Sequence, residues 1–115
     1  MFEYRIPSGA RVPMPHSHEA FDETAYGLDG VTTITLDGHE VAVRPGDVLF
    51  IPRGVVHKVE NRGPVEARGI SVNTPGLFGP EYFREMSAIL NAGGPPNVQR
   101  IVEVMQRHGL RPASV

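Results

Sequence analysis

The sequence of 115 residues contains no cysteine, and only one of its eleven basic residues, Lys58, is a lysine. The lack of cysteine excludes disulfide bonds, thiol chemistry and cysteine-rich structural zinc sites, and the single lysine leaves one candidate for Schiff-base catalysis. The chain also lacks a basic run and any apolar stretch approaching about 20 residues. With a formal net charge of −2, we therefore expect a cytoplasmic protein with no signal peptide, membrane span or nucleic-acid partner.

Three of the five histidines lie in two short stretches of the chain. The first stretch reads H-x-H-x4-E-x6-G, with His16, His18, Glu23 and Gly30 at its defined positions. Because alternate side chains of a strand share a face, the two histidines leave the same face, and Glu23 can return to it after a short turn. The second stretch reads G-x5-P-x-G-x2-H-x3-N, with Gly46, Pro52, Gly54, His57 and Asn61 at its defined positions.

In this order, and with fifteen residues between them, the two stretches closely resemble the two signature motifs of the cupin superfamily. The resemblance covers residues 16–61 motif by motif and extends to a barrel from about residue 2 to residue 73. It implies a mostly β fold, a single-domain cupin with a double-stranded β-helix or jelly-roll barrel, and a homodimer. It also implies metal ligands on the inside of the barrel, namely His16, His18, Glu23 and His57.

Three imidazoles and one carboxylate suit a divalent transition metal better than Ca²⁺ or Mg²⁺, which prefer oxygen ligands. We expect Fe or Mn first, with Ni, Zn, Co and Cu as alternatives. An octahedral ion with four protein ligands keeps two positions open for a bidentate substrate, or for substrate with water or dioxygen. The alternative is that the histidines are ordinary polar residues of a barrel without metal.

Small residues beside Glu23 predict an open pocket. Ala25 and Gly27 share its strand parity, unless a bulky neighbour such as Phe50 or Phe21 fills the space. Val12 and Met14 share the parity of the two histidines, so they line the same cavity or pack in the core. The candidate pocket residues are Met14, Phe21, Ala25, Gly27, Phe50, Val59 and Arg68.

Arg68 has two interpretations. If Ile70 and Val72 face the interior, Arg68 does so too, and a buried arginine needs an anionic partner such as a substrate carboxylate, Glu23 or Asp22. Most charged strand residues are exposed, so a structural ion pair or an outward side chain is the favoured alternative.

Turn residues divide the barrel into strands. Asp37-Gly38 between alternating runs predicts a hairpin that pairs Leu36 with His39, Ile34 with Val41 and Thr32 with Val43. Pro13 and Pro15 lack an amide hydrogen, so the strand carrying the two histidines is expected at a sheet edge or to be irregular. Structural turn roles are expected for Gly30, Gly46, Pro52, Gly54 and Asn61.

After a barrel over residues 1–74, we expect a helical extension over residues 75–115 that packs on it. Pro80 suits the first position of a helix that runs to about Asn91, and Asn97 can cap a second helix that stops at Gly109. Aromatic residues at this end form a lid over the pocket or simply pack in the core, and they are Phe78, Tyr82 and Phe83.

The first hypothesis for function is a mononuclear metalloenzyme that acts on a small, metal-chelating organic molecule. The resemblance favours dioxygenase-like oxidative cleavage, followed by isomerase, lyase or decarboxylase chemistry. Glu23 is a ligand and a candidate base. Glu19, Asp22 and Tyr26 are candidate bases by proximity only, and surface carboxylates are the favoured alternative. The alternatives are a sensor or binding cupin without turnover, and a barrel that its metal merely stabilises.

Overall fold

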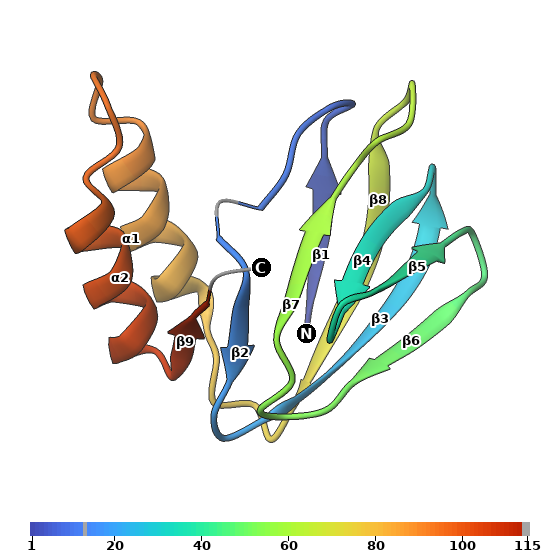
Figure 1. Ribbon diagram of the computed structural model, residues 1–115, viewed down its shortest axis with the longest axis horizontal. Helices are drawn as coiled ribbons and strands as arrows, with labels where there is room; N and C mark the ends of the chain where they lie inside the picture. The colour runs from blue at the N-terminus through green and yellow to red at the C-terminus, as the bar shows by residue number, and fades with distance from the viewer. Residues whose placement is uncertain (13, 114–115) are drawn as a thin grey trace.

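The computed structural model describes residues 1–12 and 14–113 as a set of β-strands followed by a helical pair (Figure 1). The strands are β1 (Phe2–Ile6), β2 (His16–His18), β3 (Asp22–Asp29), β4 (Thr32–Leu36), β5 (His39–Val43), β6 (Val48–Ile51), β7 (His57–Glu60), β8 (Ala67–Thr74) and β9 (Leu110–Pro112). The helices are α1 (Pro80–Leu90) and α2 (Val98–Arg107). No helix among these residues has the length and apolar content needed to cross a membrane.

Two sheets share one core. The four-stranded sheet has the order β1-β8-β3-β6 and the five-stranded sheet the order β5-β4-β7-β2-β9. Ala25 and Ile51 from the first sheet pack with Ile34 and Val43 from the second in a single buried cluster. Inward apolar residues from two antiparallel sheets are what hold a jelly-roll barrel together. The predicted mostly β barrel is therefore confirmed.

The β4–β5 hairpin has the predicted register. Asp37 and Gly38 have φ angles of 48° and 82°, the left-handed conformation that a type I′ turn needs at both central positions. The observed pairs include Leu36–His39, Ile34–Val41 and Thr32–Val43. The two-residue turn thus sets which side chains of both strands reach the core.

Both helices begin where the sequence predicts. Pro80 is the first residue of α1, and the Asn97 side chain accepts a hydrogen bond from the Arg100 backbone N–H (3.2 Å) at the start of α2. The helices lie beside β2 and β9 (Figure 1). A second buried cluster joins them to the barrel, and it contains Phe21, Tyr82, Met86, Ile89, Ile101, Val104, Met105 and Leu110.

The strand β9 was not expected, because the sequence predicts a helical extension over residues 75–115 whose second helix stops at Gly109, with no strand in it. Gly109 has a φ of 82°, and the chain then runs antiparallel to β2, with Leu110 opposite His18. β2 consequently lies between β7 and β9, so the predicted edge position is wrong. The alternative, an irregular strand, agrees with its length of three residues and its single register pair with β7, His16–His57. That prediction was based on Pro13 and Pro15, and Pro13 lies outside the described residues. A boundary at residue 74 stays a prediction.

Gly27 has a different role from the one expected. A Cβ atom at this position would overlap the backbone carbonyl oxygen of Arg44. The backbone N–H of Gly27 donates to the Asp47 carbonyl, and the N–H of Gly46 donates to the Gly27 carbonyl, each at 2.9 Å. Gly27 therefore allows the loop before β6 to approach β3, and it adds no open volume beside Glu23.

Replacing Gly27 by alanine is expected to lower the free energy of unfolding by about 1–3 kcal/mol, because the added methyl group overlaps backbone that cannot move freely. Urea denaturation followed by circular dichroism measures this. Gly76→Ala is the matched control, since a Cβ there has no heavy atom within 4 Å, and its effect should stay within about 0.5 kcal/mol. Equal stability of Gly27→Ala and the parent protein would contradict the packing argument.

Candidate metal centre

Three buried imidazoles converge from two strands. His16 and His18 belong to β2, and His57 opens β7 directly opposite His16 in the register. The ring centroids of the three pairs are 4.6 to 5.1 Å apart. One nitrogen from each ring lies within 4.8 Å of the others, so the three residues form a group that could hold a metal ion.

Backbone carbonyls orient two of the imidazoles. Nδ1 of His16 lies 2.9 Å from the Met14 carbonyl oxygen, and Nδ1 of His57 lies 3.0 Å from that of Val55. A carbonyl only accepts hydrogen bonds, so each Nδ1 carries the proton and each Nε2 keeps its lone pair. Such contacts fix the ring orientation and tautomer of histidines that bind metals.

Phe21 supports the third imidazole. Its ring stacks on His18 with centroids 4.4 Å apart and an interplanar angle of 21°. Phe21 is only 1% exposed and belongs to the helical cluster. It therefore supports the back of His18 and does not line the cavity. The backbone of His18 is also held, since its carbonyl accepts a hydrogen bond from Gly54 N–H at 2.8 Å.

Glu23 reaches the same point from β3, in the opposite sheet. Its Oε1 lies 3.7 Å from Nε2 of His18 and 3.6 Å from Nε2 of His57. The other oxygen, Oε2, accepts a hydrogen bond from Ser71 Oγ at 2.6 Å. The structure thus brings together the four side chains that the sequence analysis singled out. Neutral imidazoles with one carboxylate are a donor set that fits a divalent transition metal.

The charge states of these groups favour a metal ion. Burial and the nearby His57 lower the pKa of His16 to about 4. Burial lowers the pKa of His18 to about 3, although Glu23 opposes this shift. Burial alone would raise the pKa of Glu23, but contacts with His57 and Ser71 outweigh it, so this pKa lies below its ordinary value. At neutral pH these groups therefore offer imidazole lone pairs and a negative carboxylate.

A cavity of about 570 Å³ adjoins the centre. All three histidines and Glu23 line it, together with Ala25 and Val59 of the candidate pocket residues and with Val12. Most other walls are apolar, and five of them are aromatic. These aromatic residues are Phe2 and Tyr4 of β1 and the three at the start of the helical region, Phe78, Tyr82 and Phe83.

Besides Phe21 and Gly27, two more candidate pocket residues lie elsewhere. Phe50 is 54% exposed on β6, because in this strand the inward parity belongs to Leu49 and Ile51, which join the barrel core. Met14 is half-buried and packs against the helical cluster. Neither side chain is among the residues that line the cavity.

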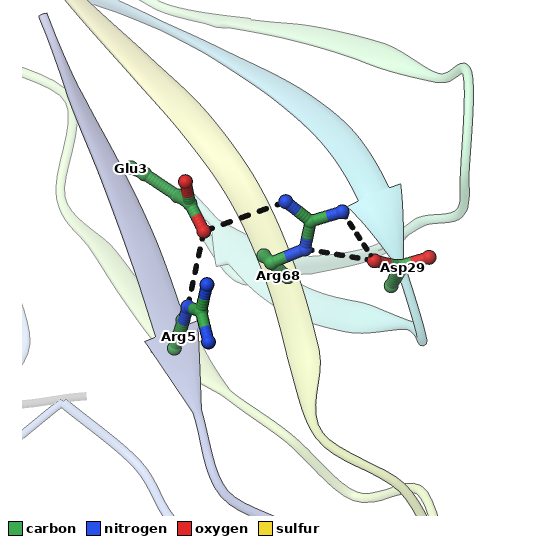
Figure 2. A network of polar contacts seen from close by, with 4 residues as sticks. All are labelled: Glu3, Arg5, Asp29 and Arg68. Carbon is green, nitrogen blue, oxygen red and sulfur yellow. Dashed lines mark hydrogen bonds and ion pairs between the residues drawn. The ribbon is translucent and has the colours of Figure 1, made fainter.

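Arg68 points away from the centre. On β8 the buried positions are Ala67, Gly69, Ser71 and Asn73, so Arg68 has the outward parity. Figure 2 shows its guanidinium between Asp29, at 2.6 Å, and Glu3, at 3.5 Å. Arg68 therefore forms surface ion pairs, and its partners differ from the Glu23 or Asp22 proposed for a buried side chain.

The turn residues of the two motifs shape loops between the strands. The φ angles are 63°, 89° and 82° at Gly30, Gly46 and Gly54. Pro52 directly follows β6 and precedes the last of these turns. Asn61 is 1% exposed, and its side chain donates to the carbonyls of Ile6 and Val65 and accepts from Gly63 N–H. Asn61 thus ties the end of β7 to β1.

Ser71 and Tyr4 were missed by the sequence analysis. Ser71 contacts Glu23, and Tyr4 lines the cavity while its hydroxyl lies 2.9 Å from Thr32 Oγ1. The alternation of Phe2, Tyr4 and Ile6 was a usable signal for Tyr4. For Ser71 the apolar pattern of β8 indicated the wrong face.

Comparison with known proteins agrees with this architecture. A sequence model of the cupin domain matches residues 2–73. Quercetin 2,3-dioxygenase of Bacillus subtilis is 38% identical over 80 residues, which are 70% of this chain and 23% of that protein. Tetracenomycin polyketide synthase protein TcmJ of Streptomyces glaucescens is 35% identical over 85 residues, which are 72% of this chain and 57% of that protein.

Solved structures show the same fold. The crystal structure of a predicted oxalate decarboxylase from Thermotoga maritima matches with a TM-score of 0.58 and 31% identity, and the match covers 62% of this chain and 61% of that one. This chain therefore spans less than two thirds of each of these three relatives.

His57→Ala is expected to abolish stoichiometric metal binding, because it removes one of three converging imidazoles and leaves the other two without their partner. Elemental analysis of protein purified without an affinity tag or added metal measures this. His39→Ala is the control, since His39 is an exposed residue at the tip of the β4–β5 hairpin. Equal metal content in both variants would contradict the assignment of His57.

The metal-free protein is expected to lose stability as the pH falls from about 6.5 toward 4. The pKa values of His16 and His18 lie below the ordinary value of 6.5. In this pH range the unfolded chain therefore binds more protons than the folded protein. The free energy of unfolding then falls by up to about 1.4 kcal/mol per pH unit for each histidine.

Urea denaturation of the metal-free protein at several pH values measures this slope. His16→Gln should reduce it, whereas His39→Gln should leave it unchanged. Stability that stays constant between pH 6.5 and 4 would show that the two imidazoles are not buried in their neutral form.

Proposed function

Because this chain belongs to the cupin family and presents a three-histidine centre, we propose that it is a mononuclear metal-dependent oxidoreductase of the dioxygenase type. The observation that carries the proposal is the position of the centre. Three imidazoles and Glu23 line a 570 Å³ cavity whose other walls are mainly apolar and aromatic. The proposed substrate is an aromatic molecule that chelates the ion through two neighbouring oxygens, and Fe or Mn is the proposed metal.

The distribution of charge favours an uncharged aromatic substrate over a small dianion. Among the described residues lining the cavity, the two arginines, Arg5 and Arg11, are both exposed. A divalent ion held by the Glu23 carboxylate would offset one charge of a buried dianion, and the second charge would need a partner of its own. The interior walls supply aromatic rings instead. This supports a substrate like that in the name of the Bacillus subtilis relative, quercetin, over oxalate.

The side chains of the centre have distinct roles in this proposal. The Nε2 atoms of the three histidines and Oε1 of Glu23 would hold the ion, which would supply Lewis-acid activation of the substrate and redox chemistry with dioxygen. Glu23 also accepts the proton of the substrate hydroxyl. The apolar walls exclude water from the ionised substrate. Burial raises the pKa of Tyr4, so its hydroxyl stays neutral beside Thr32 Oγ1, 2.9 Å away.

Binding without turnover is the second candidate, and the scarcity of proton-transferring groups favours it. Glu19 pairs with Arg111, Asp22 pairs with Arg53, and Tyr26 is 40% exposed on the far side of β3. None of these three lines the cavity. Two carboxylates line the cavity among the described residues, the exposed Glu3 and the half-buried Glu23. Glu23 is thus the one carboxylate beside the histidines, and a metal-dependent sensor or carrier would need no other. The homodimer stays a prediction.

An oxygen electrode separates the two candidates. Protein loaded with Fe²⁺ or Mn²⁺ is expected to consume one dioxygen per flavonol, with both oxygen atoms recovered in the cleaved product. Flavone is the matched control, because it lacks the hydroxyl that completes the chelate. Flavonol binding without oxygen uptake would support the binding module, and failure to bind flavonol at all would overturn the proposed substrate class. Uptake with His57→Ala equal to the parent would overturn the role of the centre.

A further inference from the structure

Ser71 is a buried hydroxyl with a single side-chain partner, the Glu23 carboxylate. It lies on β8, which pairs with β3 so that Asn73 faces Glu23 and Ser71 faces Ala25. From this diagonal position Ser71 Oγ donates to Glu23 Oε2 at 2.6 Å. Ser71 is 1% exposed, so water does not compete for this hydrogen bond. A short hydrogen bond to an ionised oxygen is among the stronger ones in proteins.

This contact gives the two oxygens of Glu23 different surroundings. Oε2 is engaged by Ser71 on β8, whereas Oε1 lies within 3.7 Å of Nε2 in both His18 and His57. Without Ser71 the carboxylate could rotate about its last side-chain bond and exchange the two oxygens. The hydrogen bond therefore selects one orientation.

We propose that Ser71 is a positioning residue that holds Glu23 with a single oxygen directed at the three histidines. This inference rests on the proposed function, since it concerns how the centre holds its ion. A carboxylate restrained in this way binds through one oxygen and leaves room at the centre for a chelating substrate. Ser71 itself touches neither the imidazoles nor the cavity among the described contacts.

The other inward residues of β8 make no side-chain hydrogen bond to Glu23. The inward residues before it on β8 are Ala67 and Gly69, which carry no polar side-chain atom. The next inward residue, Asn73, has an amide nitrogen without a hydrogen-bond partner. Ser71 is therefore the described residue of β8 whose side chain contacts Glu23 through a hydrogen bond.

The experiment uses Co²⁺ alone as the probe, because its visible spectrum reports the number and arrangement of its ligands. Ser71→Ala is expected to weaken Co²⁺ binding by about 10- to 100-fold, as loss of a residue that orients a metal ligand usually does. Its visible spectrum should also change, because the freed carboxylate can bind through both oxygens. Ser87→Ala is the control, since Ser87 lines the cavity from α1 and bonds to Asn91. This control should match the parent in affinity and spectrum.

A double-mutant cycle with Glu23→Ala tests whether Ser71 acts through Glu23. In the Glu23→Ala background, Ser71→Ala should change the affinity by less than about twofold, because the group that it positions is gone. An equal loss in both backgrounds would overturn the inference and assign Ser71 to general stability. Parent-like affinity and spectrum in Ser71→Ala would also overturn it. Failure of the parent itself to bind Co²⁺ would instead overturn the proposed function.

Discussion

The metal centre depends on one short contact between distant segments, the pairing of His16 in β2 with His57 in β7. A strand of three residues is too short to hold its register alone. Two further contacts support it: Gly54 N–H donates to the His18 carbonyl on one side, and β9 pairs along the whole of β2 on the other. The C-terminal helices thus contribute to the centre indirectly, because they deliver β9 and pack Phe21 behind His18.

Burial of the imidazoles disfavours their protonation in acid, and the same burial keeps their lone pairs free to bind an ion. Protons on separate imidazoles repel one another across the group, and burial lowers the pKa values of His16 and His18 further. A single divalent ion avoids this repulsion, because the lone pairs and the Glu23 oxygen meet at one point and share its charge. Protonating several imidazoles separately therefore costs more free energy than binding one divalent ion that all the ligands share.

The features that spacing controls were predictable from the sequence, and those that packing controls were not. The ligand spacing, the Asp37-Gly38 hairpin and the helix starts at Pro80 and Asn97 depend on local geometry, and the structure has them where the motifs indicated. The orientation of β8 was not predictable by hydrophobic alternation, because its apolar residues Ile70 and Val72 face outward. At one inward position, Gly69, a Cβ atom would overlap the ring of Tyr4, so a larger side chain does not fit there. Because the apolar residues of β8 face outward, Arg68 also faces outward, and Ser71 faces inward where the sequence did not predict it.

The family motif cannot name the substrate, because part of the cavity wall lies outside the matched region. The cupin match ends at residue 73, whereas Phe78, Tyr82 and Phe83 line the cavity from the following segment. Their rings are in contact with one another, and Phe2 packs against Phe83 with centroids 4.8 Å apart. A ligand that fills the cavity therefore touches both the barrel and the helical segment. The fold alone does not determine the chemistry, so the ligand has to be argued from the site itself, including the aromatic rings that follow the matched region.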